Sequence, residues 1–217
     1  MNRNEPALKD PGPFDTFPTI GTISPTRYRA HNRAHSPWWF SADRSGRFDL
    51  TDGEGTCYLA SDIETALRES FGPLLDPRQV ISATAVRFRV VSEVELPLNL
   101  IFADLGNSRA VRFGAIREIA TTTDYPLAGK WAAAFRKIPV DGIRYNGRFT
   151  SVSDPNSWAL FGPAGEDTTR TVAALAAVTG AEACAAAGIT IVDADITRYT
   201  PVPSGSAPAG PQRPSPL

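Results

Sequence analysis

The sequence predicts one α+β domain of short strands with flanking helices. Its 217 residues suffice for one domain with its own core. A hydrophobic content of 42% and a charged content of 21% are ordinary for a globular protein. Apolar runs typical of strands are interspersed with helical patterns, which favours a mixed architecture. We expect a flexible segment at 1–24, the domain at 25–200, and a disordered proline-rich tail at 201–217, because neither end sustains an apolar period.

Short apolar runs bounded by turn residues predict the strands. In chain order they are "TRYRA" (26–30), "GTCYLA" (55–60), a longer "VISATAVRFRVV" (80–91), "NLIFADL" (99–105), "DGIRY" (141–145), "SWALFG" (157–162) and "ITIVDA" (189–194). The order and pairing of these strands stay open.

One helix, "SDIETALRESFG" (61–72), carries nearly complete start and stop signals. Ser61 is a natural N-cap and Glu64 follows at the capping-box spacing, while Gly72 ends the helix. Further helical patterns cover 107–120, 127–137 and the alanine-rich stretch 167–187.

Charge and cysteine content exclude several classes of protein. The net charge of −1 gives no general attraction to nucleic acid or to an anionic membrane. Cys57 and Cys184 are too few for a disulfide framework, so we expect both reduced in a cytoplasmic protein. No signal peptide or membrane-spanning run is visible. His31 and His35 stand four residues apart, but Pro37 argues against a helix there, so no metal site is expected.

The stretch from Arg29 to Glu69 gathers cations, aromatic rings and one carboxylate beyond what a fold needs. The guanidinium groups of Arg29 and Arg47 match phosphate oxygens. Trp39 can stack on a flat ring. Tyr58 lies in a strand, and Glu69 lies off the apolar face of its helix. Taken singly, each residue is more often a core or surface residue than a ligand.

Four pieces in order, "YRAH", "PWWFS", "SGRFDL" and "GTCYLASDIETALRES", resemble the RES domain family over about residues 25–165. The resemblance implies a fold similar to that of ADP-ribosylating toxins. It implies an enzyme that cleaves NAD as its substrate, usually the toxin of a bacterial toxin–antitoxin pair. An antitoxin protein is then the expected partner, without nucleic acid or membrane, and a homo-oligomer stays open.

The resemblance also implies roles for individual residues. It assigns catalysis to Glu69, Arg29 and Tyr58, and NAD binding to Arg29, Arg47 and Tyr58. Trp39 is added to the NAD-binding residues because its ring can stack on a flat ligand ring. The chemistry agrees with this choice, because nicotinamide leaves as a neutral ring and needs no acid. What must be stabilised is positive charge developing on the ribose, and one carboxylate, Glu69, supplies that field.

One position departs from the family's pattern. Where many members have a serine, this chain has Gly147, and Ser151 or Ser157 is the candidate replacement. A Gly147→Ser substitution is accordingly expected to raise activity. Three functions stay open: NAD cleavage by water or phosphate, ADP-ribosyl transfer to a macromolecule, and an NAD-binding or interaction module without catalysis.

Overall fold

The computed structural model describes residues 10–12, 14, 16–22, 24–151, 154, 156–170 and 177–193. Its strands are β1 (Thr19–Gly21), β2 (Thr26–Asn32), β3 (Trp39–Phe40), β4 (Glu54–Ala60), β5 (Val80–Ser82), β6 (Arg89–Glu95), β7 (Ile101–Asp104), β8 (Gly142–Tyr145), β9 (Ser157–Pro163), β10 (Gly165–Glu166), β11 (Ala177–Thr179) and β12 (Thr190–Val192). Its helices are α1 (Ile63–Phe71), α2 (Ala83–Val86), α3 (Glu118–Thr121), α4 (Tyr125–Phe135) and α5 (Gly180–Ala186), with 3-10 turns η1 (Gly72–Leu74) and η2 (Ser108–Phe113). The predicted α+β class is confirmed.

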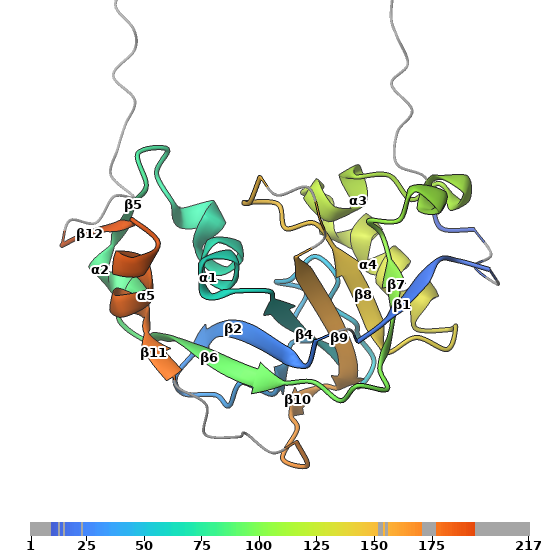
Figure 1. Ribbon diagram of the computed structural model, residues 1–217, viewed down its shortest axis with the longest axis horizontal. Helices are drawn as coiled ribbons and strands as arrows, with labels where there is room; N and C mark the ends of the chain where they lie inside the picture. Colours follow the sequence, from blue (N-terminus) through green and yellow to red (C-terminus); the bar gives the residue numbers. More distant parts are fainter. Residues whose placement is uncertain are drawn as a thin grey trace, which may run out of the picture.

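Eight of the strands form one sheet, in the order β1-β7-β8-β9-β4-β2-β6-β11 (Figure 1). Its neighbours are antiparallel except for the parallel pair β7 and β8. Two small sheets, β10-β3 and β12-β5, accompany it. In Figure 1, α1 lies between a group of helices near β11, which contains α2 and α5, and a group near β8, which contains α3 and α4.

Alternating side chains divide the core between the two faces of the sheet. Leu59 of β4 and Trp158 of β9 belong to an apolar cluster on one face. On the opposite face, Ala159 packs into a second cluster with α4, and Ala60 packs into a third with α1 and α5. The face that carries the helices therefore has two separate cores.

The sheet is split between β2 and β4. These neighbours share one register pair, Tyr28 with Ala60, whereas β2 pairs with β6 along its whole length. Toward its N-terminal end β4 bridges the loop after β3 instead, through Thr56 and Ser41. From Ala60 toward the N-terminal end of β4, the strands β2 and β4 therefore separate. The gap between them lies on the helical face, between the two cores.

The start of α1 differs from the expected capping box. Asp62, one residue after Ser61, is the N-cap, and its Oδ1 accepts the Thr65 N–H at 2.7 Å. Ser61 donates to Asp62, and Glu64 pairs with Arg68 at 2.8 Å. The carboxylate of Asp62 is the stronger acceptor, so the helix begins one residue later than the serine signal indicated.

Three further expectations need correction. The stretch 80–91 is not one strand, because the Ser82 hydroxyl accepts from the Ala85 N–H and caps α2 between β5 and β6. Residues 107–120 form η2 and α3, separated at Gly114, which has a φ of 78°. Where the residues expected to form a helix over 167–187 are described, β11 precedes α5, and the helix starts where Thr179 forms a capping box with Glu182.

The segment 1–24, expected to be flexible, contributes to the core where it is described. β1 pairs with β7, and Phe14 and Phe17 are buried in the cluster that contains α4. Phe14 stacks on Phe135 with ring centroids 4.5 Å apart, and Phe17 meets the same ring edge-on at 4.8 Å. Aromatic burial anchors this segment although it shows no sequence period. The proline-rich tail at 201–217 lies outside the described residues.

The helices and the two cysteines bear on the expectations about membranes and disulfides. Within the described ranges no helix has the length and apolar character needed to cross a membrane. Cys57 and Cys184 are both buried, and neither forms a disulfide.

We predict that Phe17→Ala lowers the free energy of unfolding by about 3–5 kcal/mol, because it leaves a cavity among packed aromatic rings. Urea denaturation measures this change. The control is Leu98→Ala, whose side chain is 67% exposed and should shift stability by less than about 0.5 kcal/mol. If the two variants were equally stable, the N-terminal segment would not be part of the core.

Candidate functional site

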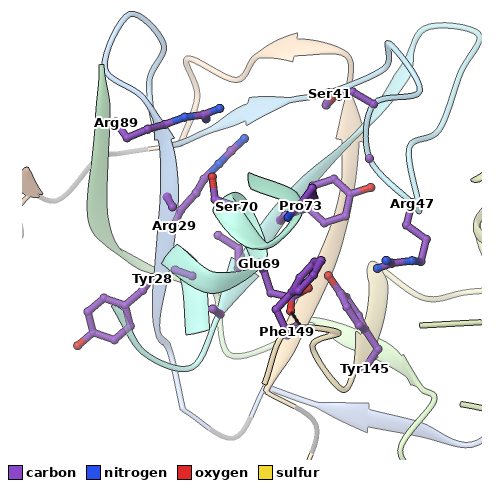
Figure 2. Close-up of a pocket in the computed structure, with 18 of the residues that line it drawn as sticks. Tyr28, Arg29, Ser41, Arg47, Glu69, Ser70, Pro73, Arg89, Tyr145 and Phe149 are labelled. Carbon is purple, nitrogen blue, oxygen red and sulfur yellow. Dashed lines mark hydrogen bonds between the residues drawn. The ribbon is translucent and has the colours of Figure 1, made fainter. Parts of the chain in front are cut away.

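A cleft of about 330 Å³ opens on the helical face, where the sheet divides. Its lining residues come from β2, β4, α1, η1, β6, α4, β8, β9 and the loops beside them (Figure 2). Its charged lining residues are Arg29, Arg47, Glu69 and Arg89; its aromatic ones are Tyr28, Tyr58, Tyr125, Tyr145 and Phe149. Three guanidinium groups against one carboxylate favour an anionic ligand.

Glu69 projects into this cleft from the last turns of α1 (Figure 2). Its Oε1 accepts the backbone N–H of Phe149 at 2.7 Å, so the loop after β8 fixes the carboxylate from across the cleft. The ring of Phe149 in turn lies against Gly72, where a Cβ would come within 2.2 Å of the ring. The glycine that ends α1 therefore also admits the ring that accompanies Glu69.

Gly147 lies directly beside this carboxylate. A Cβ at that position would lie 2.8 Å from Glu69 Oε1 and 3.0 Å from Ser157 Oγ. The expected serine therefore has no free space at position 147. Ser157, which is 1% exposed at the start of β9, already places a hydroxyl there. Of the two candidate replacements, Ser157 lines the cleft; Ser151 is exposed outside it.

Tyr145, at the end of β8, supplies a second hydroxyl to the cleft. Burial raises the pKa of Tyr145 above its ordinary value, and the negative charge of Glu69 raises it further, while Arg47 opposes this effect. The phenol therefore stays protonated at neutral pH and can donate a hydrogen bond. Its ring also packs edge-on against Phe48, with centroids 5.0 Å apart.

Arg29 extends from β2 into the gap beside β4. It is 7% exposed, and its Nη1 donates to the Pro37 carbonyl at 2.5 Å and to Cys57 Sγ at 2.7 Å. Its other guanidinium N–H groups have no hydrogen-bond partner in the part of the chain that the structure describes. These two contacts orient the guanidinium group of Arg29 and leave its remaining N–H groups available to a ligand.

Arg47 enters from the opposite wall, on the loop after Ser45-Gly46. Its Nε donates to the Thr122 carbonyl at 3.1 Å, and its guanidinium lies 5.6 Å from the centre of the Tyr125 ring. Neither Nη group has a partner among the described residues, so both can reach an anion. The structure thus brings Arg29, Arg47 and Glu69 to one cleft.

Tyr58 lines the cleft with its ring, but its hydroxyl has a structural partner on each side. It donates to Asp49 Oδ1 at 2.8 Å and accepts the Phe48 N–H at 2.8 Å. Burial raises the pKa of Tyr58 well above normal, and Asp49 adds to the rise. Since Asp49 also accepts from Gly46 N–H at 3.0 Å, this network holds the loop that carries Arg47. Tyr58 is placed to position that loop.

Trp39, expected to bind NAD, does not line the cleft. It lies in β3, where it pairs with Glu166 of β10, and its ring packs against that of His35 at a tilt of 31°, with centroids 4.2 Å apart. The neighbouring Trp38 and Phe40 are buried in the cluster on the other face of the sheet. The aromatic run therefore serves packing, and the rings of the cleft come from later in the chain.

The histidines give no sign of a metal site. His31 is buried, and its Nε2 lies 2.9 Å from Ser92 Oγ. Burial lowers the pKa of His31, and the charges of Arg29 and Arg89 lower it further. Within the described ranges, no group of three or more metal-binding side chains occurs.

Sequence reasoning missed Tyr145, Phe149 and Arg89, and it did not place Ser157. The first two belong to the stretch "DGIRYNGRF" (141–149), in which the sequence predicted a strand at 141–145 and no site residue. Nothing in the alternating pattern of residues 80–91 marks Arg89, because its place in the cleft depends on the pairing of β6 with β2.

Comparisons with known proteins give two findings. A family model described as the RES domain matches residues 26–179. The fold is similar to that of a chain in the crystal structure of the M. tuberculosis MbcT-MbcA toxin-antitoxin complex. That likeness has a TM-score of 0.55 and 16% sequence identity, and covers 78% of this chain and 92% of that chain. No curated protein matches the sequence.

We predict that Tyr58→Phe lowers the free energy of unfolding by roughly 1–3 kcal/mol, because it leaves the Phe48 N–H and one Asp49 oxygen without their partner. Chemical denaturation measures the loss. Tyr28→Phe is the control for loss of a phenol hydroxyl outside the core, since the Tyr28 hydroxyl points away from the cleft (Figure 2) and its partner Glu93 is not buried, so water can replace the lost contact. Equal stability of both variants would contradict the anchoring role.

Proposed function

Because the chain belongs to the RES domain family, we propose that it cleaves the bond between nicotinamide and ribose in NAD. The observation that carries this proposal is the position of Glu69. It is the one carboxylate among the described residues of a cleft that also holds three arginines and several aromatic rings. NAD matches this lining, since it combines a pyrophosphate, flat rings and a ribose that becomes positive as nicotinamide leaves.

The arginines would hold the pyrophosphate. Arg29 and Arg47 lie on opposite walls, and each is already oriented by one or two contacts to backbone or sulfur. A guanidinium group that is already held in place loses less conformational entropy on binding a phosphate than a freely rotating one does. Tyr145 and Phe149 offer apolar surface to the nicotinamide ring at the Glu69 end of the cleft.

The chemical step requires electrostatic stabilisation more than proton transfer. As the bond to nicotinamide breaks, its electron pair moves to the ring nitrogen, the ring becomes neutral, and the ribose carbon becomes cationic. Glu69, held by the Phe149 N–H, would stabilise that cation through a ribose hydroxyl or through space. Ser157, beside the same carboxylate, would orient the ribose or the attacking water or phosphate.

We also propose that the chain is the toxin of a toxin–antitoxin pair. A chain of a toxin–antitoxin complex shares its fold, and RES domains commonly act in such pairs. Depletion of NAD would then account for growth inhibition, and a bound antitoxin would prevent it.

We predict that Glu69→Gln lowers the turnover of NAD by about 10²–10³-fold with a KM within a few-fold of the parent, because it removes a charge that acts mainly in the transition state. Nicotinamide release, followed by chromatography, gives both constants. Glu95→Gln, an exposed glutamate at the end of β6, should match the parent.

The products of the same assay separate the alternatives. ADP-ribose indicates hydrolysis, a phosphorylated ADP-ribose indicates phosphorolysis, and label transferred to a macromolecule indicates ADP-ribosyl transfer. If folded Glu69→Gln turned over NAD at the parental rate, the mechanism would be refuted. If the parent protein bound NAD but released no product, it would be an interaction module without catalysis.

The position of Gly147 gives a second prediction. Gly147→Ala places a Cβ 2.8 Å from Glu69 Oε1, which is too close, and the end of the Glu69 side chain is the nearest group that can move. We therefore expect the carboxylate to shift from its bond to Phe149. We expect turnover to fall by roughly 10²-fold, the scale of a misplacement of about 1 Å, with stability close to the parent. Gly147→Ser should fall as well, so the geometry argues against the gain expected from the family's pattern.

The control for this steric effect is Gly12→Ala, because a Cβ at Gly12 meets nothing within 4 Å. Turnover is measured by nicotinamide release and stability by denaturation. A rise in activity for Gly147→Ser would show that the family's hydroxyl fits there and that Ser157 does not replace it.

A further inference from the structure

A second basic surface lies at the edge of the cleft, where β2 ends and β6 begins. We define the Arg33 patch as Arg33, Arg87, Phe88 and Arg89. The Phe88 ring is 43% exposed, and the guanidinium carbons of Arg33 and Arg87 lie 5.1 and 4.9 Å from its centre. The Arg33 N–H donates to the Phe88 carbonyl at 2.8 Å, which fixes the turn against the ring. Two cations thus share one exposed aromatic platform.

The positive charge of this patch is not compensated within the described part of the chain. None of the ion pairs found there involves Arg33, Arg87 or Arg89. The carboxylate of Glu182, near in the fold through β11 and α5, accepts from both the N–H and the hydroxyl of Thr179 at 2.8 Å. That carboxylate caps α5 and forms no ion pair with the arginines, and Arg33 and Arg87 are exposed, so their charge is available to a partner.

An apolar groove of about 400 Å³ runs beside the arginines. Val86, Val90 and Ile191 supply its apolar lining, and all three arginines of the patch border it. A surface of this kind pairs cations with a place for an aliphatic side chain. It favours a ligand that is both acidic and partly apolar.

We propose that the Arg33 patch binds an acidic segment of a partner protein. Its carboxylates would contact Arg33 and Arg87, and an aliphatic side chain would enter the groove. A nucleic acid fits less well, because the chain has a net charge of −1 and the arginines surround an apolar groove that a sugar–phosphate backbone would not fill.

Arg89 connects this surface to the cleft. It lines both the groove and the cleft that contains Glu69, and Figure 2 shows it extending in the same direction as Arg29. A segment bound to the Arg33 patch would therefore reach the rim of the cleft and could restrict access to it. This inference rests on charge and shape at the patch and does not depend on the proposed cleavage of NAD.

Binding of a labelled peptide to the full chain tests the proposal without any measurement of activity. The probe is a fluorescein-labelled peptide of five glutamates and two leucines, titrated at low salt and followed by fluorescence anisotropy. Arg33→Glu/Arg87→Glu replaces two attractive charges with repulsive ones at exposed positions. We expect it to weaken binding at least about tenfold, whereas the protein should stay folded.

The matched control is Arg109→Glu/Arg112→Glu, which makes the same charge change at two exposed arginines of η2. It should bind the peptide within about twofold of the parent. Phe88→Ala, which keeps every charge, should weaken binding because the aromatic platform is lost.

Amide chemical-shift mapping locates the bound peptide. Shifts around Arg33, Phe88 and Ile191 support the proposal. Absence of binding, an equal loss in both double variants, or shifts confined to Glu69 and Tyr145 would overturn it. Tighter binding of a single-stranded oligonucleotide of equal charge, lost in the same variant, would assign the patch to nucleic acid instead.

Discussion

The buried side-chain amide of Asn156 holds together the segments on which the cleft depends. Its nitrogen donates to the hydroxyl of Thr65 on α1 at 3.2 Å and to that of Thr150 at 3.1 Å, and its oxygen accepts the Gly147 N–H at 2.9 Å. One amide therefore fixes the helix that carries Glu69 against the loop that orients it. At 6% exposure these hydrogen bonds face little competition from water, so the amide imposes one arrangement of helix, loop and strand.

The second constraint is the division of the sheet. With one register pair between β2 and β4, the two cores on the helical face pack against different helices and leave space between them. Arg29 crosses that space from β2, while Arg47 and Glu69 approach from a loop and a helix. Each cationic group is held by a contact to backbone or sulfur, so charges that would repel one another are fixed around one opening.

Burial sets the protonation state of two tyrosines in the cleft. The phenols of Tyr58 and Tyr145 stay protonated because burial raises the pKa of each, and the nearby carboxylates Asp49 and Glu69 reinforce this. The first phenol holds a loop, and the second faces the ligand space. Phenols that keep their protons suit a reaction whose leaving group needs no proton, which links the electrostatics of the fold to the proposed chemistry.

The sequence by itself determined the α+β class, most of the strands and the helix of Glu69, because apolar periods and caps are local properties. The grouping of Arg29, Arg47 and Glu69 came from the ordered series of motifs that resembles the RES family, since each residue taken singly indicated no site. Tertiary structure alone decided that Trp39 lies outside the cleft and that Ser157 occupies the space beside Gly147. These outcomes depend on which strands separate and which loops cross between them. Such contacts join residues far apart in the chain, and no local pattern encodes their distances.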